Sequence, residues 1–191
     1  MRGRSALVVL ALALMTGAAH AQTQAPRAPP PPPGEFYAHL RPAFSLRVPP
    51  GFTINERHRY TRLGPGKAIE GVAFMIPRAM TEGTNLAADS YVSVEWRDGQ
   101  RCTLADFLAD ATEEEQLNDN GVRWQVGTAG DAGAGNIYEE TVHLRGCGAV
   151  RGFVHSTNIA NYPPGTVRAY DRVALGNAVD AIRRSLKWGG R

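Results

Sequence analysis

The spacing of apolar residues predicts a chain that is mostly strand. Apolar and polar residues alternate over residues 44–48 and 91–96, which is the period of a strand with one buried face. Residues 72–76 form a continuous apolar run that ends at Pro77, which cannot donate a hydrogen bond to a sheet. The same reasoning predicts three further strands, over residues 122–126, 137–144 and 149–157.

Two segments have the spacing of helices instead. Thr103 and Asp106 match the capping-box pattern, and apolar residues recur at helical spacing over 104–111, so we expect a helix there that frays through 113–115. The second helix is capped by Asp171 and carries cations in its last turns, which suit the negative end of a helix dipole. Its apolar stripe consists of Leu175, Ala178, Val179, Ile182 and Leu186.

Strands therefore dominate, and most connections are of the antiparallel type. The segments 57–67, 127–135 and 158–169 are rich in glycine, proline or basic residues and are predicted as loops. This order excludes the regular strand–helix alternation of a doubly wound parallel sheet. The sequence predicts a single α+β domain over residues 35–191, with a mainly antiparallel sheet and two main helices packed on it.

The two ends of this domain resemble a known group of exported proteins. The domain opens with an extended segment at 44–49, followed by Gly51 and Phe52, and closes with the helical segment 181–187. These patterns, together with the order of elements over 36–188, are similar to the PsbP-like α/β/α sandwich domains. The resemblance implies an accessory or binding role, since proteins of that fold are mostly non-enzymatic, and it implies no functional residues.

The amino terminus has the three parts of a cleaved signal peptide. Arg2 and Arg4 are basic, and residues 5–15 are almost entirely apolar. Ala19 and Ala21 are the small residues that signal peptidase accepts before its cleavage site. The apolar part is shorter than the about 20 residues that span a bilayer. We therefore predict a signal peptide over residues 1–21 and a periplasmic or secreted protein.

A proline-rich segment over residues 22–34 follows the signal peptide. Proline fixes φ and lacks an N–H, so the run from Pro29 to Pro33 favours an extended polyproline II form. The segment is either a stiff spacer or a docking peptide for an aromatic groove.

The net charge of the chain argues against two classes of partner. The formal net charge is +3, and loss of Arg2 and Arg4 with the signal peptide reduces it to +1. A nearly neutral chain gives no electrostatic reason to expect nucleic acid or an anionic membrane surface as a partner. No segment after the signal peptide reaches the length of an integral membrane span, and no cofactor is predicted.

Cys102 and Cys147 are the two cysteines of the chain. In an oxidising compartment an even pair predicts a disulfide; the alternative is two buried free thiols. No Cys-x-x-Cys motif supports a redox role.

A metal site is the most specific chemistry that the sequence suggests. If the hairpin turn between the strands at 137–144 and 149–157 is centred near Cys147, His155 faces Glu139, and His143 shares that face. Two histidines and a carboxylate form a familiar metal-binding set. The alternative is an exposed face with no function, because a register error of one residue separates the set.

Other catalytic motifs are missing from the sequence, so no catalytic residue is predicted. There is no Gly-x-Ser-x-Gly, and the glycines at 130–136 precede a strand rather than a helix, so they do not match a phosphate-binding loop. In the loop 158–169, Asn158, Asn161 and Tyr162 are candidate ligand-binding residues. The alternative is that this loop merely turns the chain into the last helix.

These observations favour an exported non-catalytic domain that binds a protein or a cell-envelope component. The alternative is a small metal-dependent hydrolase that uses His143, His155 and Glu139. A secreted inhibitor or immunity protein fits the same sequence features as the binding domain.

Overall fold

The computed structural model describes residues 34–189. The predicted signal peptide over 1–21 and nearly all of the proline-rich segment over 22–34 lie outside the described residues. The elements in chain order are β1 (Glu35–Leu40), β2 (Ala43–Val48), β3 (Thr53–Tyr60), β4 (Ile69–Met75), α1 (Arg78–Thr81), β5 (Tyr91–Trp96), η1 (Leu104–Asp106), β6 (Glu113–Asp119), β7 (Val122–Gly133), β8 (Asn136–Arg145), β9 (Gly148–Thr157), η2 (Ile159–Asn161), α2 (Arg172–Ser185) and β10 (Lys187–Trp188).

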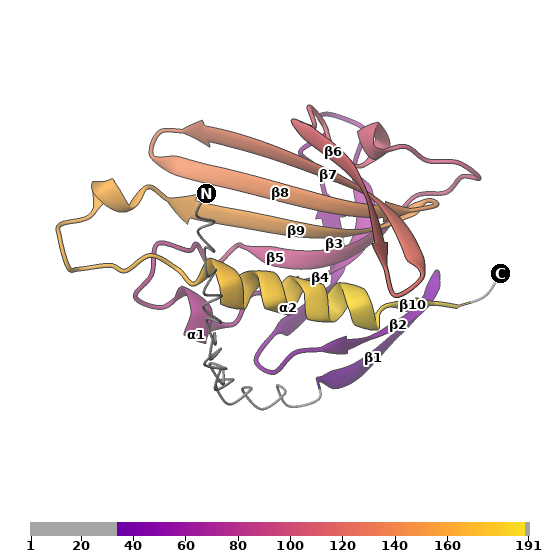
Figure 1. Cartoon of the computed structure of the whole chain (residues 1–191), viewed down its shortest axis with the longest axis horizontal. Coiled ribbons are helices and arrows are strands. Elements are labelled where there is room, and N and C mark those ends of the chain that lie inside the picture. Colours follow the sequence, from indigo (N-terminus) through magenta and orange to yellow (C-terminus); the bar gives the residue numbers. More distant parts are fainter. Residues whose placement is uncertain (1–33, 190–191) are drawn as a thin grey trace, which may run out of the picture. The chain divides into compact units, whose positions relative to one another are not determined.

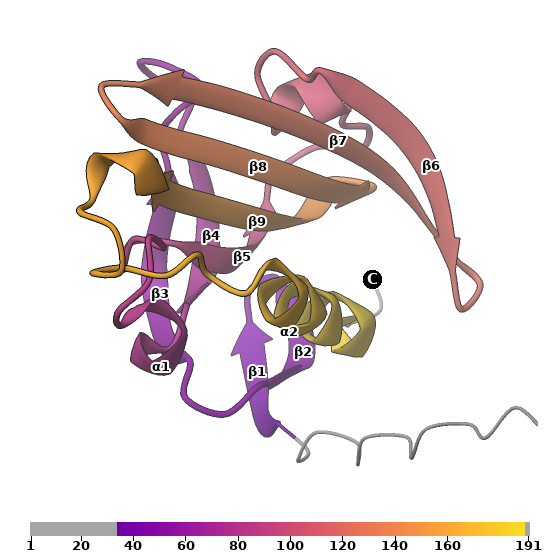
Figure 2. The ribbon, with the colours of Figure 1, turned by 60° about the vertical axis from the view of Figure 1, so that its left-hand side comes forward.

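Two antiparallel sheets and two α-helices make up the fold, which confirms the predicted α+β class. The large sheet has the order β3-β4-β5-β9-β8-β7-β6, and the small sheet has the order β1-β2-β10. All pairings between these strands are antiparallel. The large sheet curves so that α2 lies along its concave face, with β1 and β2 beneath the helix (Figures 1 and 2).

The predicted last helix is confirmed as α2, and its apolar stripe completes the concave core. The side chain of Asp171 accepts a hydrogen bond from the Ala174 N–H at 2.9 Å and so caps the helix. Leu175 and Ile182 are buried against the sheet, each of which stabilises the fold by roughly 1.5–3 kcal/mol. The helix ends at Ser185, because the next residues pair with β2 as the short strand β10.

The predicted helix over 104–111 is wrong in length. The capping box at Thr103 and Asp106 is present, but only the single turn η1 follows it. Leu104, Phe107 and Leu108 are buried on the convex face of the sheet, so their spacing reflects packing rather than a continued helix. Leu104 and Leu108 lie close to Gly127, where an added Cβ would stand 3.2 Å from Leu108.

Three segments predicted as loop or frayed helix are strands. β3 includes residues 57–60, β6 includes 113–115, and β7 continues through most of the glycine-rich segment 127–135. β3 and β6 are the edges of the large sheet and most of their residues are exposed, so no buried face creates an alternating pattern. Charged residues on such edges also discourage pairing with other chains.

A buried ion cluster joins the centre of the large sheet to the segment that covers its convex face. Arg151 on β9 has no exposed surface, and its guanidinium forms a bidentate pair with Glu95 on β5, with both N–O distances 2.9 Å. The same group donates to Glu140 on β8 and to the backbone carbonyl of Phe107. It also lies over the Tyr60 ring, 3.5 Å from the ring centre.

The two central charges of this cluster hold each other ionised. Burial alone would raise the pKa of Glu95, but the Arg151 charge and hydrogen bonds outweigh it and lower the pKa. Glu140 accepts two further interactions, from the Tyr60 hydroxyl at 2.8 Å and from Arg62 at 3.2 Å. The buried carboxylates are thus satisfied by several donors each, as buried charges require.

The predicted disulfide is present in the structure. Cys102 and Cys147 are bonded, with their Cα atoms 5.0 Å apart. The bond ties the segment before η1 to the turn between β8 and β9.

Removal of Arg151 is expected to destabilise the protein strongly. Arg151→Met leaves Glu95 buried without its cation, so we expect the free energy of unfolding to fall by about 3–5 kcal/mol. Arg172→Met is the matched control, since it breaks an exposed pair with Glu139 and should cost less than about 1 kcal/mol. Urea denaturation followed by circular dichroism measures both, and similar small losses in the two variants would contradict this account of the cluster.

Loss of the disulfide is expected to lower the melting temperature by roughly 10 °C. The bond closes a loop with a sequence separation of 45 residues, and such a closure restricts the unfolded chain by about 4 kcal/mol. Thermal denaturation of Cys102→Ser, Cys147→Ser and the reduced wild type should give the same lowered value. A reductant should not shift the variants further, and a wild-type melting temperature that reduction leaves unchanged would refute the expected stabilisation.

Candidate functional site

A pocket of about 790 Å³ lies where the two sheets meet at the disulfide end of the molecule. Its volume is in the range of small-molecule sites. We call it the arginine pocket. It is lined by Arg41, Pro42, Ala43, Trp96, Arg97, Asp98, Gly99, Gln100, Arg145, Cys147, Gly148, Trp188 and Gly189.

Backbone contacts between segments distant in sequence hold the walls of this pocket. The Gly189 N–H donates to the Ala43 carbonyl at 2.7 Å, and the Arg97 N–H donates to the Cys147 carbonyl at 3.0 Å. Gly148 lies directly against the Trp188 ring, where an added Cβ would stand 2.4 Å from the nearest ring carbon. The ends of β5, β8 and β10 are therefore fixed relative to one another.

The two tryptophans of the lining pack on Phe44, which is buried and is not itself a lining residue. The centre of the Phe44 ring lies 6.1 Å from that of Trp96, 5.4 Å from that of Trp188 and 5.0 Å from that of His39. His39 Nδ1 lies 3.0 Å from the Pro42 carbonyl, which fixes the turn between β1 and β2. Two tryptophans thus line the pocket in positions that their neighbours determine.

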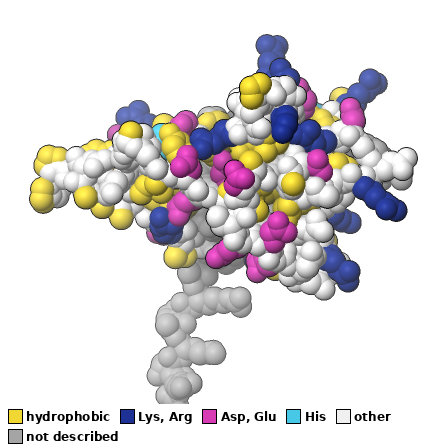
Figure 3. Space-filling view, turned by 90° about the horizontal axis from the view of Figure 1, so that it is seen from above, with side chains coloured by type: hydrophobic (Ala, Val, Ile, Leu, Met, Phe, Trp, Pro, Cys, Tyr) yellow, Lys and Arg dark blue, Asp and Glu magenta, His cyan; other side chains and the backbone are white. Residues whose placement is uncertain are grey.

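The charge of the lining is positive. The lining contains three arginines, Arg41, Arg97 and Arg145, and one aspartate, Asp98. Its formal charge is therefore +2. None of the three arginines forms an ion pair with a carboxylate of residues 34–189. Figure 3 shows Lys and Arg side chains spread over the right-hand end, where the β8–β9 turn lies in Figure 1.

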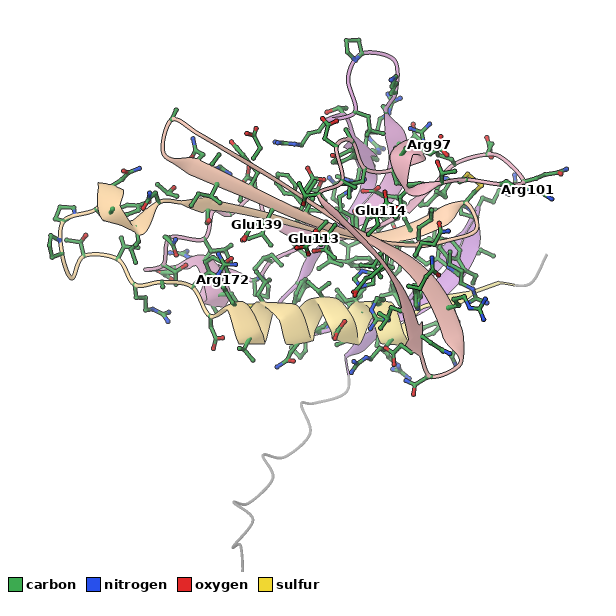
Figure 4. All side chains as sticks on the ribbon, turned by 45° about the horizontal axis from the view of Figure 1, so that its top comes forward. Arg97, Arg101, Glu113, Glu114, Glu139 and Arg172 are labelled. Carbon is green, nitrogen blue, oxygen red and sulfur yellow. A yellow bond between two sulfur atoms is a disulfide. The ribbon has the colours of Figure 1, made fainter. Side chains whose placement is uncertain are left out.

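Two buried N–H donors on the lining residues also lack a partner. They are Arg97 Nε and Trp188 Nε1, two of the four buried side-chain atoms without a hydrogen bond in the described part of the chain. Another donor group of Arg97 is used, since NH2 donates to the Lys67 carbonyl at 3.2 Å. Figure 4 shows Arg97 and Arg101 in the segment that follows β5. The Arg97 guanidinium also lies over the ring of buried Phe107, 5.9 Å from the ring centre, so this side chain is anchored within the fold.

The predicted metal set is not assembled, and its register was wrong by one residue. The turn between β8 and β9 has two residues, so Arg145 pairs with Gly148, and His155 lies opposite Tyr138 rather than Glu139. A shift of one residue moves a side chain to the other face of a sheet. His155 is therefore on the convex face and His143 on the concave face, and no cluster of three or more metal-binding side chains occurs within residues 34–189.

Each member of that predicted set has a different neighbourhood. Glu139 accepts hydrogen bonds from the Tyr170 hydroxyl at 3.1 Å and from Arg172 at 3.0 Å, which links β8 to the start of α2 (Figure 4). The two ring nitrogens of His155 lie 2.8 Å from Asp89 Oδ1 and 3.1 Å from Asn136 Oδ1.

His143 is held in the neutral form. It lies 8% exposed in a groove between β8 and α2, and burial lowers its pKa to about 4, with a further contribution from the nearby Arg183 charge. The Asp180 carboxylate raises the same pKa, but by less than burial and the Arg183 charge together lower it. A neutral, half-enclosed histidine with Glu139 at the same groove does not by itself form a reactive pair.

The loop residues predicted to bind a ligand shape the loop. The Asn158 side chain accepts a hydrogen bond from the Ala160 N–H at 3.0 Å and caps η2. Asn161 lies against Gly135, where an added Cβ would stand 2.2 Å from its side-chain nitrogen. Tyr162 is half-buried. Ligand binding by these three residues stays a prediction.

Sequence reasoning missed the arginine pocket because its residues come from four separate segments. Arg41, Arg97 and Arg145 are single arginines with no shared spacing, and only the fold brings them together. The one available signal was the predicted disulfide, because Cys147 lies in the pocket wall and Cys102 is bonded to it.

Comparisons with known proteins give a likeness in structure only. No protein-family model matches the sequence, and neither does any curated protein. The solution structure of cyanobacterial PsbP from Synechocystis sp. PCC 6803 is similar, with a TM-score of 0.41 and 12% identity over 81% of this chain and 92% of that chain. None of the helices within residues 34–189 has the length and apolar character needed to cross a membrane.

The His143 environment predicts a loss of stability in mild acid. The unfolded chain binds a proton near the ordinary pKa of 6.5, whereas the folded chain does so only near 4. The stabilisation that the neutral His143 provides is therefore complete above about pH 6.5 and is lost as pH falls toward 4, with a maximum of about 3 kcal/mol. His143→Gln should show a smaller change in melting temperature between pH 7 and 4.5 than the wild type. An NMR titration midpoint of His143 at or above pH 6.5 would rule this out.

Proposed function

We propose that this chain is an exported, non-catalytic domain that binds a protein or a cell-envelope component through the arginine pocket. The observation that carries the proposal is a preformed pocket whose cations have no carboxylate partner among the described residues. Its walls come from strand ends, from the turn at Cys147 and from the segment after β5 that the disulfide restrains. Sites held in this way bind without reorganisation, which favours affinity.

Two features support export. The amino-terminal pattern is that of a signal peptide, and the Cys102–Cys147 bond fits an oxidising compartment. A periplasmic or secreted location accounts for both.

A binding role fits the site better than the hydrolase alternative. Glu139 and His143 lie on one face of the sheet and His155 on the other, so the ligands that a metal-dependent hydrolase would use are separated by the sheet itself. The arginine pocket offers donors and aromatic walls, which recognise and orient a ligand.

A photo-crosslinking experiment tests the proposed site. A benzoylphenylalanine placed at Gln100, an exposed pocket residue, should label one discrete envelope species in intact cells. The same group at Asn177, an exposed position on α2, is the matched control and should not label that species. Labelling is expected to disappear when Arg145→Glu reverses a pocket charge. Equal labelling from both positions, or none from Gln100, would overturn the proposal.

A further inference from the structure

We propose that the arginine pocket recognises a phosphate monoester, a proposal that rests on the binding function argued above. The phosphate group is the shared chemistry, and it can be carried by a soluble sugar phosphate or by a phosphorylated lipid headgroup. Two observations carry the inference: the charge of the lining and its aromatic walls.

The charge of the pocket matches that of the ligand. The three arginines and Asp98 give a formal +2, and a phosphate monoester carries between one and two negative charges at neutral pH. Guanidinium groups bind phosphate through two parallel N–H donors, which a lysine cannot reproduce. The pocket contains arginine and no lysine.

The pocket is larger than a phosphate group alone needs. At about 790 Å³ it has room for a body attached to the phosphate, and Trp96 and Trp188 offer ring surfaces for that body to pack against. Apolar faces of sugar rings and the glycerol part of a headgroup both fit such walls. The expected ligand is therefore a phosphate with an attached carbon skeleton rather than the free ion.

Binding can be followed by calorimetry and by tryptophan fluorescence of the full mature chain. We expect glucose 6-phosphate to bind more tightly than inorganic phosphate and glucose not to bind. Vesicles containing phosphatidic acid, compared with phosphatidylcholine vesicles, test the lipid source. Binding by either phosphorylated probe supports the proposal, and the two arms identify the source.

Two substitutions should move the affinity in opposite directions. Arg145→Gln removes one charge-assisted contact and should weaken glucose 6-phosphate or phosphatidic acid binding by about tenfold or more. Asp98→Asn removes the negative charge at the pocket and should strengthen it by about two- to fivefold. Arg123→Gln, at an exposed arginine of β7 outside the pocket, is the matched control and should change nothing. Since Arg145 and Asp98 are exposed, both variants should fold, which their melting temperatures check.

Several results would overturn the phosphate assignment. These are binding of succinate as tight as that of both phosphorylated probes, no binding of either probe by the wild type, or equal affinity of the Arg145→Gln and Arg123→Gln variants. If Gln100 crosslinking still labels an envelope species while no phosphorylated probe binds, the binding function stands and only the ligand class is wrong. If the probes bind but crosslinking is unspecific, the site takes phosphate and the envelope partner is wrong.

Discussion

The packing of the convex face depends on the Arg151 guanidinium. It lies at the centre of the large sheet and joins β5 through Glu95, β8 through Glu140 and the covering segment through the Phe107 carbonyl. A buried cation is costly unless it is fully paired, so the surrounding chain has little freedom to rearrange around it. The same contacts that satisfy Arg151 therefore fix where the segment after β5 can run.

That constraint extends to the arginine pocket. The chain from Trp96 to Phe107 is held at its start by β5, in its middle by the Cys102 disulfide, and at its end by Arg151. Arg97 and Asp98 lie within this restrained segment. A binding group on a segment fixed at three points keeps its geometry before the ligand arrives, which is the condition for a precise site.

The sequence predicted those elements whose apolar pattern or capping residue lies within or next to the element itself. β5 coincides with the predicted strand because its apolar residues alternate with polar ones, although Ser93 and Glu95 on the polar face are buried as well. α2 begins after Asp171 because the cap and the apolar stripe agree. β6 was missed because most of its side chains are exposed. The glycine-rich part of β7 was missed because Gly127, which is typical of a loop, is needed here to leave room for the side chains of Leu104 and Leu108. The metal set was predicted from the wrong register between β8 and β9. That register depends on the length of the turn between them, which the sequence does not specify.

The arginines of this chain divide by their partners rather than by their sequence context. Arg151 and Arg183 are buried and paired with carboxylates, and their charge is consumed within the fold. Arg41, Arg97 and Arg145 lack such partners in the described residues and converge on one pocket. Paired and unpaired arginines look alike in the sequence, and only the contacts distinguish a cation that stabilises the fold from one available to a ligand. Other arginines, such as Arg123, also lack a carboxylate partner within residues 34–189, so the pocket is distinguished by the convergence of three such arginines beside two tryptophans.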